Sequence, residues 1–149
     1  MEFTPPDHSP FLPPEYIIDL VKEHLLLHVQ LLILEHDMKV LQRNADLRMG
    51  TIYVRKHQQM IDSTLRQLNL NKRTLNEKPG LIKIVEMKIT KGKAQCWYLY
   101  NKYEYDMMLL GAYMRADIMI RIAQMMSVDL TQPCADDIEE DRGESTITL

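Results

Sequence analysis

Two histidines and a carboxylate with helical spacing are the first residues in this sequence that could do chemistry. His24 and His28 are four residues apart, and Glu35 follows seven residues later. On a helix these spacings share one face, and two histidines one turn apart can bind a metal ion. A metal-dependent hydrolase is therefore one hypothesis. Because HExxH is absent and no second His/Asp/Glu cluster is evident on another helix, we favour ordinary helix residues and predict no metal or other cofactor.

The other titratable residues form no catalytic pattern. Acids outside the C-terminal run occur singly along the chain, whereas general acid–base catalysis needs groups brought together in a cleft. The five glycines are isolated, so no glycine-rich phosphate loop is present. Neither cysteine has a histidine near it in sequence. We therefore predict that the chain is not an enzyme and has no catalytic residues.

The charges are strongly segregated along the chain. Residues 39–102 contain fourteen basic and four acidic residues, a net charge of +10, although the whole chain has −3. A run from Asp136 to Asp141 holds five acids in six positions. A basic segment of this kind attracts polyanions, and phosphate neutralisation is the main source of affinity for nucleic acid. DNA or another polyanion is therefore the predicted partner.

The segment 61–78, IDSTLRQLNLNKRTLNEK, and the residues after it carry a family resemblance. Leu68 would end one helix, and Asn71 would cap a short second helix that Leu75 turns inward. The glycine-punctuated strand pattern that follows, up to Tyr100, is similar to a wing. Over about residues 61–100 the chain resembles winged helix-turn-helix DNA-binding regulators. It departs from them at Leu65, where a small residue is usual, and at Asn69, where a glycine is usual.

This resemblance implies a set of DNA contacts on the helix-turn-helix and on the wing. Outward polar and basic side chains there suit phosphate oxygens and base edges in a major groove. The predicted nucleic-acid-binding residues are Arg66, Asn71, Lys72, Arg73, Asn76, Lys78, Lys88, Lys91 and Lys93.

Hydrophobic periodicity predicts the elements that would position these residues. Apolar residues at steps of three and four indicate helices over about 15–44, 51–68 and 103–126. Alternation over 81–100, interrupted by Lys91-Gly92, indicates a β-hairpin. The competing interpretation begins one long helix at Ala94. The predicted fold is mainly α, with three main helices and one wing-like hairpin, and the alternative is an all-α helical bundle.

The two ends are expected to lie outside the domain. Residues 1–14 hold five of the seven prolines and are predicted to form an extended arm. Residues 15–127 form a single helical domain, and residues 128–149 form an acidic disordered tail. The start lacks the basic region of a signal peptide, and the longest apolar stretch carries charges. We therefore expect a cytoplasmic, nucleoid or nuclear protein that is not secreted, with Cys96 and Cys134 reduced.

These observations favour a non-enzymatic, dimeric transcriptional regulator that binds DNA through residues 61–100. The dimer would form through the strongly apolar first helix or through the last helix, which carries six of the eleven methionines. We interpret most of those methionines as core, although methionine also suits adaptable binding surfaces. The alternative function is a helical protein–protein adaptor or inhibitor that docks through its basic or methionine-rich surface.

Overall fold

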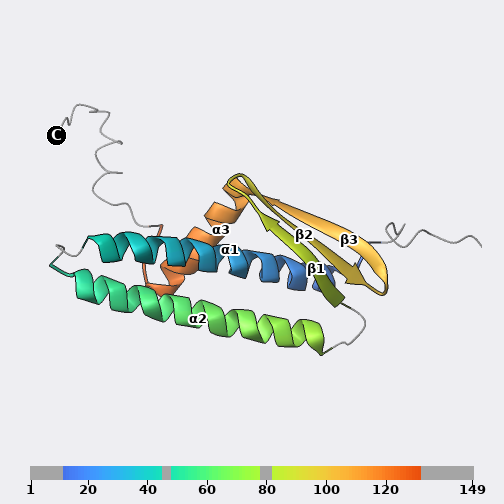
Figure 1. The fold of residues 1–149 in the computed structure, drawn as a ribbon, viewed down its shortest axis with the longest axis horizontal. Helices are drawn as coiled ribbons and strands as arrows, with labels where there is room; N and C mark the ends of the chain where they lie inside the picture. Colours follow the sequence, from blue (N-terminus) through green and yellow to red (C-terminus); the bar gives the residue numbers. More distant parts are fainter. Residues whose placement is uncertain (1–11, 45–47, 78–81, 132–149) are drawn as a thin grey trace, which may run out of the picture.

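A computed structural model of the chain describes residues 12–44, 48–77 and 82–131. Helices cover one face of a three-stranded sheet (Figure 1). Along the chain the elements are α1 (Glu15–Arg43), α2 (Gly50–Asn76), β1 (Ile82–Ile89), β2 (Lys93–Tyr100), β3 (Tyr103–Leu110) and α3 (Gly111–Met125). The mainly helical fold with three helices and a β-hairpin is confirmed, and the all-α alternative is wrong.

The first helix begins where the sequence predicts it. The carbonyl of Pro14 accepts hydrogen bonds from the amides of Ile17 and Ile18, at 3.0 and 3.2 Å. Proline suits this position because the first turn of a helix needs no amide donor there. α1 then runs antiparallel to α2 along most of its length (Figure 1).

The sheet is an antiparallel meander in the order β1-β2-β3. The predicted hairpin over 81–100 is confirmed in β1 and β2, whose register pairs Ile82 with Tyr100 and Ile89 with Ala94. The turn between them also anchors the third helix, because the amide of Gly111 donates to the carbonyl of Gly92 at 2.8 Å. A Cβ at position 111 would lie 3.1 Å from that carbonyl oxygen, so glycine permits the close approach.

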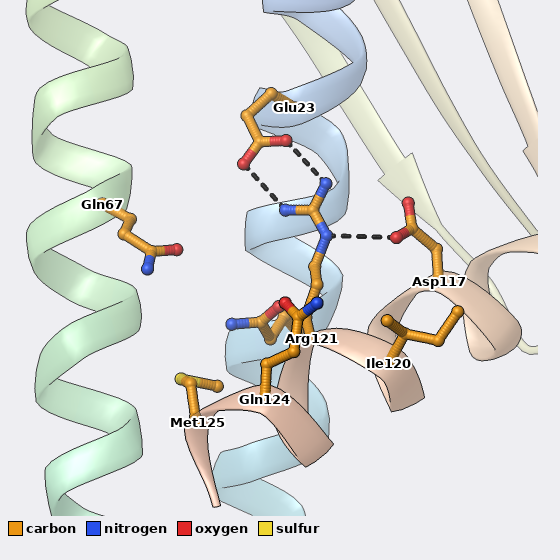
Figure 2. Close-up of a pocket in the computed structure, with 8 residues that line it drawn as sticks. Glu23, Gln67, Asp117, Ile120, Arg121, Gln124 and Met125 are labelled. Carbon is orange, nitrogen blue, oxygen red and sulfur yellow. Dashed lines mark hydrogen bonds and ion pairs between the residues drawn. The ribbon is translucent and has the colours of Figure 1, made fainter. Parts of the chain in front are cut away.

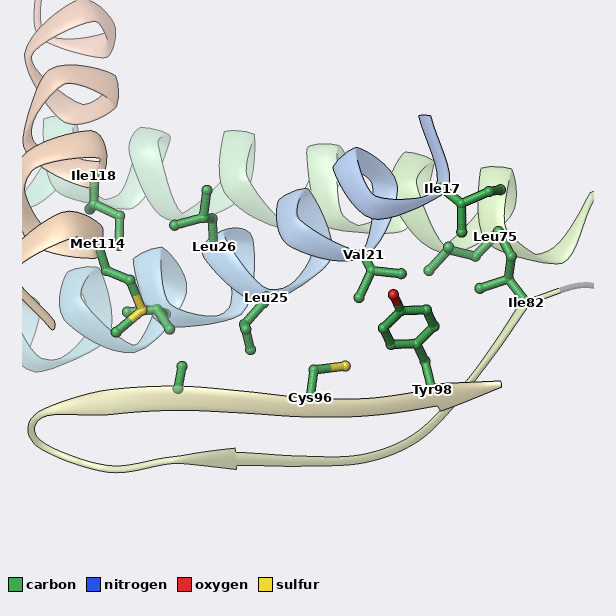
Figure 3. Close-up of a cluster of buried hydrophobic side chains, with 12 residues drawn as sticks. Ile17, Val21, Leu25, Leu26, Leu75, Ile82, Cys96, Tyr98, Met114 and Ile118 are labelled. Carbon is green, nitrogen blue, oxygen red and sulfur yellow. The ribbon is translucent and has the colours of Figure 1, made fainter. Parts of the chain in front are cut away.

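The core lies between the helices and the inner face of the sheet. Val21 and Leu25 of α1 face Cys96 and Tyr98 of β2, and all four are at most 2% exposed (Figure 3). Alternate residues of β2 point inward, as expected for a sheet buried on one face. A second cluster joins the far halves of the helices: Leu34, Met38, Met60 and Ile61.

The second helix is longer than the sequence analysis predicts. α2 continues through position 68 to Asn76, so the turn of the proposed helix-turn-helix does not form. The reason is packing, because Leu68, Asn71 and Leu75 recur at steps of three and four and are all buried. The polar residues between them form the exposed side of the same helix. The hairpin is therefore present as an element, and the helix-turn-helix expected from the resemblance to winged regulators is not formed.

The third helix is shorter than predicted. Residues 103–110, which we expected to begin it, form β3, and α3 starts at Gly111. Asn101 and Lys102 both have positive φ, 52° and 70°, which is the geometry of a tight two-residue hairpin turn. Tyr100 therefore pairs with Tyr103. Alternate residues of β3 pack on the core. This two-residue period is hard to recognise in the sequence, because large apolar residues also occupy the outward positions.

Parts of the predicted organisation fall outside the described residues. The arm over 1–14 is described only from Leu12, and the tail over 128–149 only as far as Thr131. Cys134 and Lys78 also lie outside the described part of the chain. Within that part, no helix is both long enough and apolar enough to cross a membrane.

Candidate functional site

The two histidines of α1 belong to the packing between helices. Nδ1 of His24 lies 2.8 Å from Oδ1 of Asn71 on α2, and the ring centroids of His24 and His28 are 4.6 Å apart. The pKa of His28 is lowered to about 4, mainly because burial disfavours the charged imidazolium and to a smaller extent because His24 and Lys72 are nearby. Glu35 is exposed. Among the described residues, no three His, Cys, Asp or Glu side chains are grouped as a metal site would need.

Asn71 is not available to nucleic acid. Its side chain is 7% exposed and is used at both ends, because Oδ1 bonds to His24 and Nδ2 donates to the carbonyl of Leu20 at 3.2 Å. The prediction that Asn71 contacts DNA is therefore wrong. A helix that continues through residue 71 turns this position inward instead of exposing it as a cap.

The other predicted contacts lie in two exposed groups. One is on the C-terminal half of α2: Arg66, Lys72, Arg73 and Asn76. The second surrounds the turn between β1 and β2: Lys88, Lys91 and Lys93. β1 starts near the end of α2 and leads away from it to that turn (Figure 1). Its eight residues span about 26 Å, so the structure separates the two groups by roughly the length of a strand.

A third exposed arginine of α2, Arg55, was not among the residues predicted from the sequence to bind nucleic acid. Arg55, Arg66 and Arg73 are all exposed. Residues 55 and 73 are eighteen positions apart, which is five helical turns, and residue 66 lies within about 20° of the same line. The line is about 27 Å long at 1.5 Å per residue. Within the described residues, none of the three arginines forms an ion pair. The eighteen-residue spacing is the sequence signal that could have identified Arg55.

A cavity of about 340 Å³ lies beside this group, between the helices and the first strand. Lys72 of α2 and Lys83 of β1 both line it, together with His24 and Asn76. Its polar lining carries two formal positive charges and no carboxylate. This cavity therefore extends the basic character of α2 onto the edge of the sheet.

A larger cavity, of about 550 Å³, has the opposite character and lies among the three helices (Figure 2). Nη1 and Nη2 of Arg121 each donate to one oxygen of Glu23 at 2.7 Å, and Nε donates to Asp117 at 3.3 Å. The hydrogen bonds that Arg121 donates to Glu23 raise the pKa of Arg121. The cavity is lined by Glu23, Gln30, Gln67, Asp117, Ile120, Arg121, Gln124 and Met125. Sequence reasoning did not identify this site.

The described cysteine offers no reactive site. Cys96 is a free thiol with no exposed surface. Burial raises the pKa of its thiol to about 11, so the reactive thiolate is scarce at neutral pH.

Comparison with known proteins places this arrangement in a family. Residues 12–130 match the family described as YhjD protein. The chain belongs to the YhjD family. The YhjD match begins just before α1 and ends just after α3, so it includes both the arginine line on α2 and the cavity among the helices. No match was found among curated proteins or among solved structures.

Proposed function

We propose that this YhjD-family chain is a non-enzymatic DNA-binding protein of the cytoplasm or nucleoid. It contacts duplex phosphates through the line of Arg55, Arg66 and Arg73 on α2. The observation that carries the proposal is that these exposed guanidinium groups lie along one side of a helix without carboxylate partners among the described residues. Arginine is suited to phosphate because its planar fork donates two parallel hydrogen bonds.

Because α2 is one continuous helix, we propose that the chain binds the phosphates of DNA and does not read bases through a helix-turn-helix. Phosphate contacts position a protein on DNA, whereas contacts to base edges provide sequence specificity. The short recognition helix that would have presented Asn71 is not formed. The proposed mode of DNA binding is therefore phosphate binding by α2, extended by the lysines of the β1–β2 turn. A regulatory role would depend on this phosphate binding and not on a helix-turn-helix.

A fluorescence anisotropy titration with labelled mixed-sequence duplex tests this function. We expect binding at low salt, and a variant with Arg66→Gln and Arg73→Gln should bind on the order of tenfold more weakly. The control is Arg115→Gln, which removes an exposed arginine from α3. Equal weakening in the control, or no binding by the unchanged protein, would refute the proposal.

A second candidate function, docking on another protein, is favoured by the exposed side of α3. Met119 is 61% exposed and Ile120 is 50% exposed. Most of the apolar residues of α1 that suggested a dimer are buried in the core of the monomer, whereas Met119 and Ile120 are not part of that core. We propose that a second copy of the chain packs on this side of α3, because exposed apolar patches mark interfaces.

Light scattering at about 50 μM tests this assembly, since a dimer of standard interface area persists at that concentration. The full chain should have the mass of a dimer, and Met119→Glu with Ile120→Glu should convert it to a monomer. Ile52→Glu is the matched control, because Ile52 is 56% exposed on α2. A monomeric unchanged protein, or dissociation by the control as well, would reject the α3 interface.

A further inference from the structure

The cavity of about 550 Å³ between α1, α2 and α3 is built mainly from polar side chains. Each helix supplies one glutamine: Gln30, Gln67 and Gln124. The volume is within the range of small-molecule sites, which usually combine a few well-placed polar groups with an apolar wall. Ile120 and Met125 provide apolar surface here (Figure 2).

One polar group in this lining has an unused hydrogen-bonding atom. Gln30 is 1% exposed, and its Nε2 donates to Oγ1 of Thr64 at 2.8 Å. Its Oε1 is buried and has no hydrogen-bond partner among the described residues. Buried polar atoms are almost always paired in folded proteins. Gln30 therefore offers an acceptor to a molecule that brings its own donor.

The charges of the cavity select the kind of molecule. Arg121 is the only cation in the lining, and Glu23 occupies both terminal nitrogens of its guanidinium. Asp117 adds a second carboxylate, so the lining has a formal charge of −1. An anion entering here would meet two carboxylates and an arginine that is already neutralised. A cation would gain from the excess negative charge.

We propose that this cavity binds a small organic ammonium ion. An ammonium group has three donors and no acceptor, so it matches the free Oε1 of Gln30 and the carboxylate of Asp117. A short alkyl part would lie against Met125. The site is separate from the arginine line on α2, and its occupation does not depend on the proposed DNA binding.

The test is a titration of the ¹⁵N-labelled full-length chain with butylammonium, followed by NMR of the backbone and glutamine side-chain amides. We expect saturable shifts of the Gln30, Gln67 and Gln124 side-chain signals. Butyrate, which has the same alkyl chain and a negative charge, should cause none of them. If butylammonium gives no saturable shift, or if butyrate gives the same shifts, the proposal is wrong.

Substitution of Gln30 distinguishes binding of butylammonium at a specific site from general attraction of cations to the chain. Gln30→Met keeps the length of the side chain and removes the acceptor, and the hydroxyl of Thr64 still donates to the carbonyl of Met60. No buried donor is left unpaired, so we expect this variant to fold. Its affinity for butylammonium should fall by about tenfold or more. Gln59→Met, at an exposed position on α2, is the control and should bind normally.

Asp117→Asn provides a second variant at a partly exposed position, so folding is not at risk there. It removes one carboxylate and should also weaken butylammonium binding by about tenfold. Unchanged affinity in both the Gln30 and the Asp117 variants would overturn the inference, whether or not DNA binds elsewhere on the chain.

Discussion

Nδ1 of His24 and Oδ1 of Asn71 are 2.8 Å apart and join α1 to α2 across 47 positions of sequence. Because the amide nitrogen of Asn71 donates to the carbonyl of Leu20, its oxygen must accept, and the proton therefore lies on Nδ1 of His24. Asn71 thus satisfies a side chain and a backbone carbonyl of the neighbouring helix. This residue holds the helical pair together and does not contact a ligand.

Replacing Asn71 tests that structural role. Asn71→Ala should lower the free energy of unfolding by about 1–3 kcal/mol, because it leaves a buried donor on His24 and the Leu20 carbonyl without their partner. Asn69→Ala is the matched control, since Asn69 is exposed on the same helix. Urea unfolding followed by circular dichroism measures both. A loss of DNA affinity without a loss of stability in Asn71→Ala would restore Asn71 as a binding residue.

The histidines make stability depend on pH. The pKa of His28 is lowered to about 4, below the value of 6.5 for the free side chain, mainly because burial disfavours the charge. Between these values the unfolded chain binds more protons than the native chain, so unfolding becomes easier as pH falls from about 6.5 toward 4. Above pH 6.5 this contribution to stability is fully present.

Urea midpoints measured across that pH window check the prediction. The unchanged protein should lose stability on acidification, and His28→Gln should reduce the dependence. His36→Gln, at an exposed position of α1, is the control. If His28→Gln retains the full dependence on pH, His28 is not the titrating group.

The buried cysteine gives a direct probe of the core. In a Cys134→Ser variant the only remaining thiol is Cys96, which has no exposed surface and a pKa raised to about 11. A disulfide reagent such as DTNB should therefore leave the native variant unlabelled and label it fully in denaturant. Rapid labelling of the native protein would show that β2 does not pack against α1 as the structure has it.

The sequence allowed local structure to be predicted where a local signal was strong. Pro14 marks the start of α1, and Lys91-Gly92 marks the hairpin turn. The prediction was wrong where one pattern fits two structures. The polar run after Leu68 was predicted to form a turn and a short second helix, but it is the exposed side of one continuous helix whose inward positions are Asn71 and Leu75. The length of α2 is decided by its packing against α1. A short stretch of sequence around Leu68 holds no information about that packing.

The two candidate sites also differ in how far they could be predicted from the sequence. Arg55, Arg66 and Arg73 lie on one helix, so their alignment follows from helical geometry once the helix is known to be continuous. The cavity among the helices could not be predicted, because Gln30 and Thr64 are 34 residues apart and Arg121 reaches Glu23 across 98. Those contacts require the relative placement of three helices.

The salt dependence of DNA affinity tests the central claim most directly. Each phosphate neutralised by a cationic side chain adds about 0.9 to the slope of log affinity against log salt concentration. Replacing Arg55, Arg66 and Arg73 by glutamine should therefore reduce the magnitude of the slope by about 2.7. A control of equal charge, with Arg43, Lys102 and Arg115 replaced by glutamine, should keep the original slope. An unchanged slope in the first variant, or an equal reduction in both, would contradict phosphate binding by the arginine line of α2.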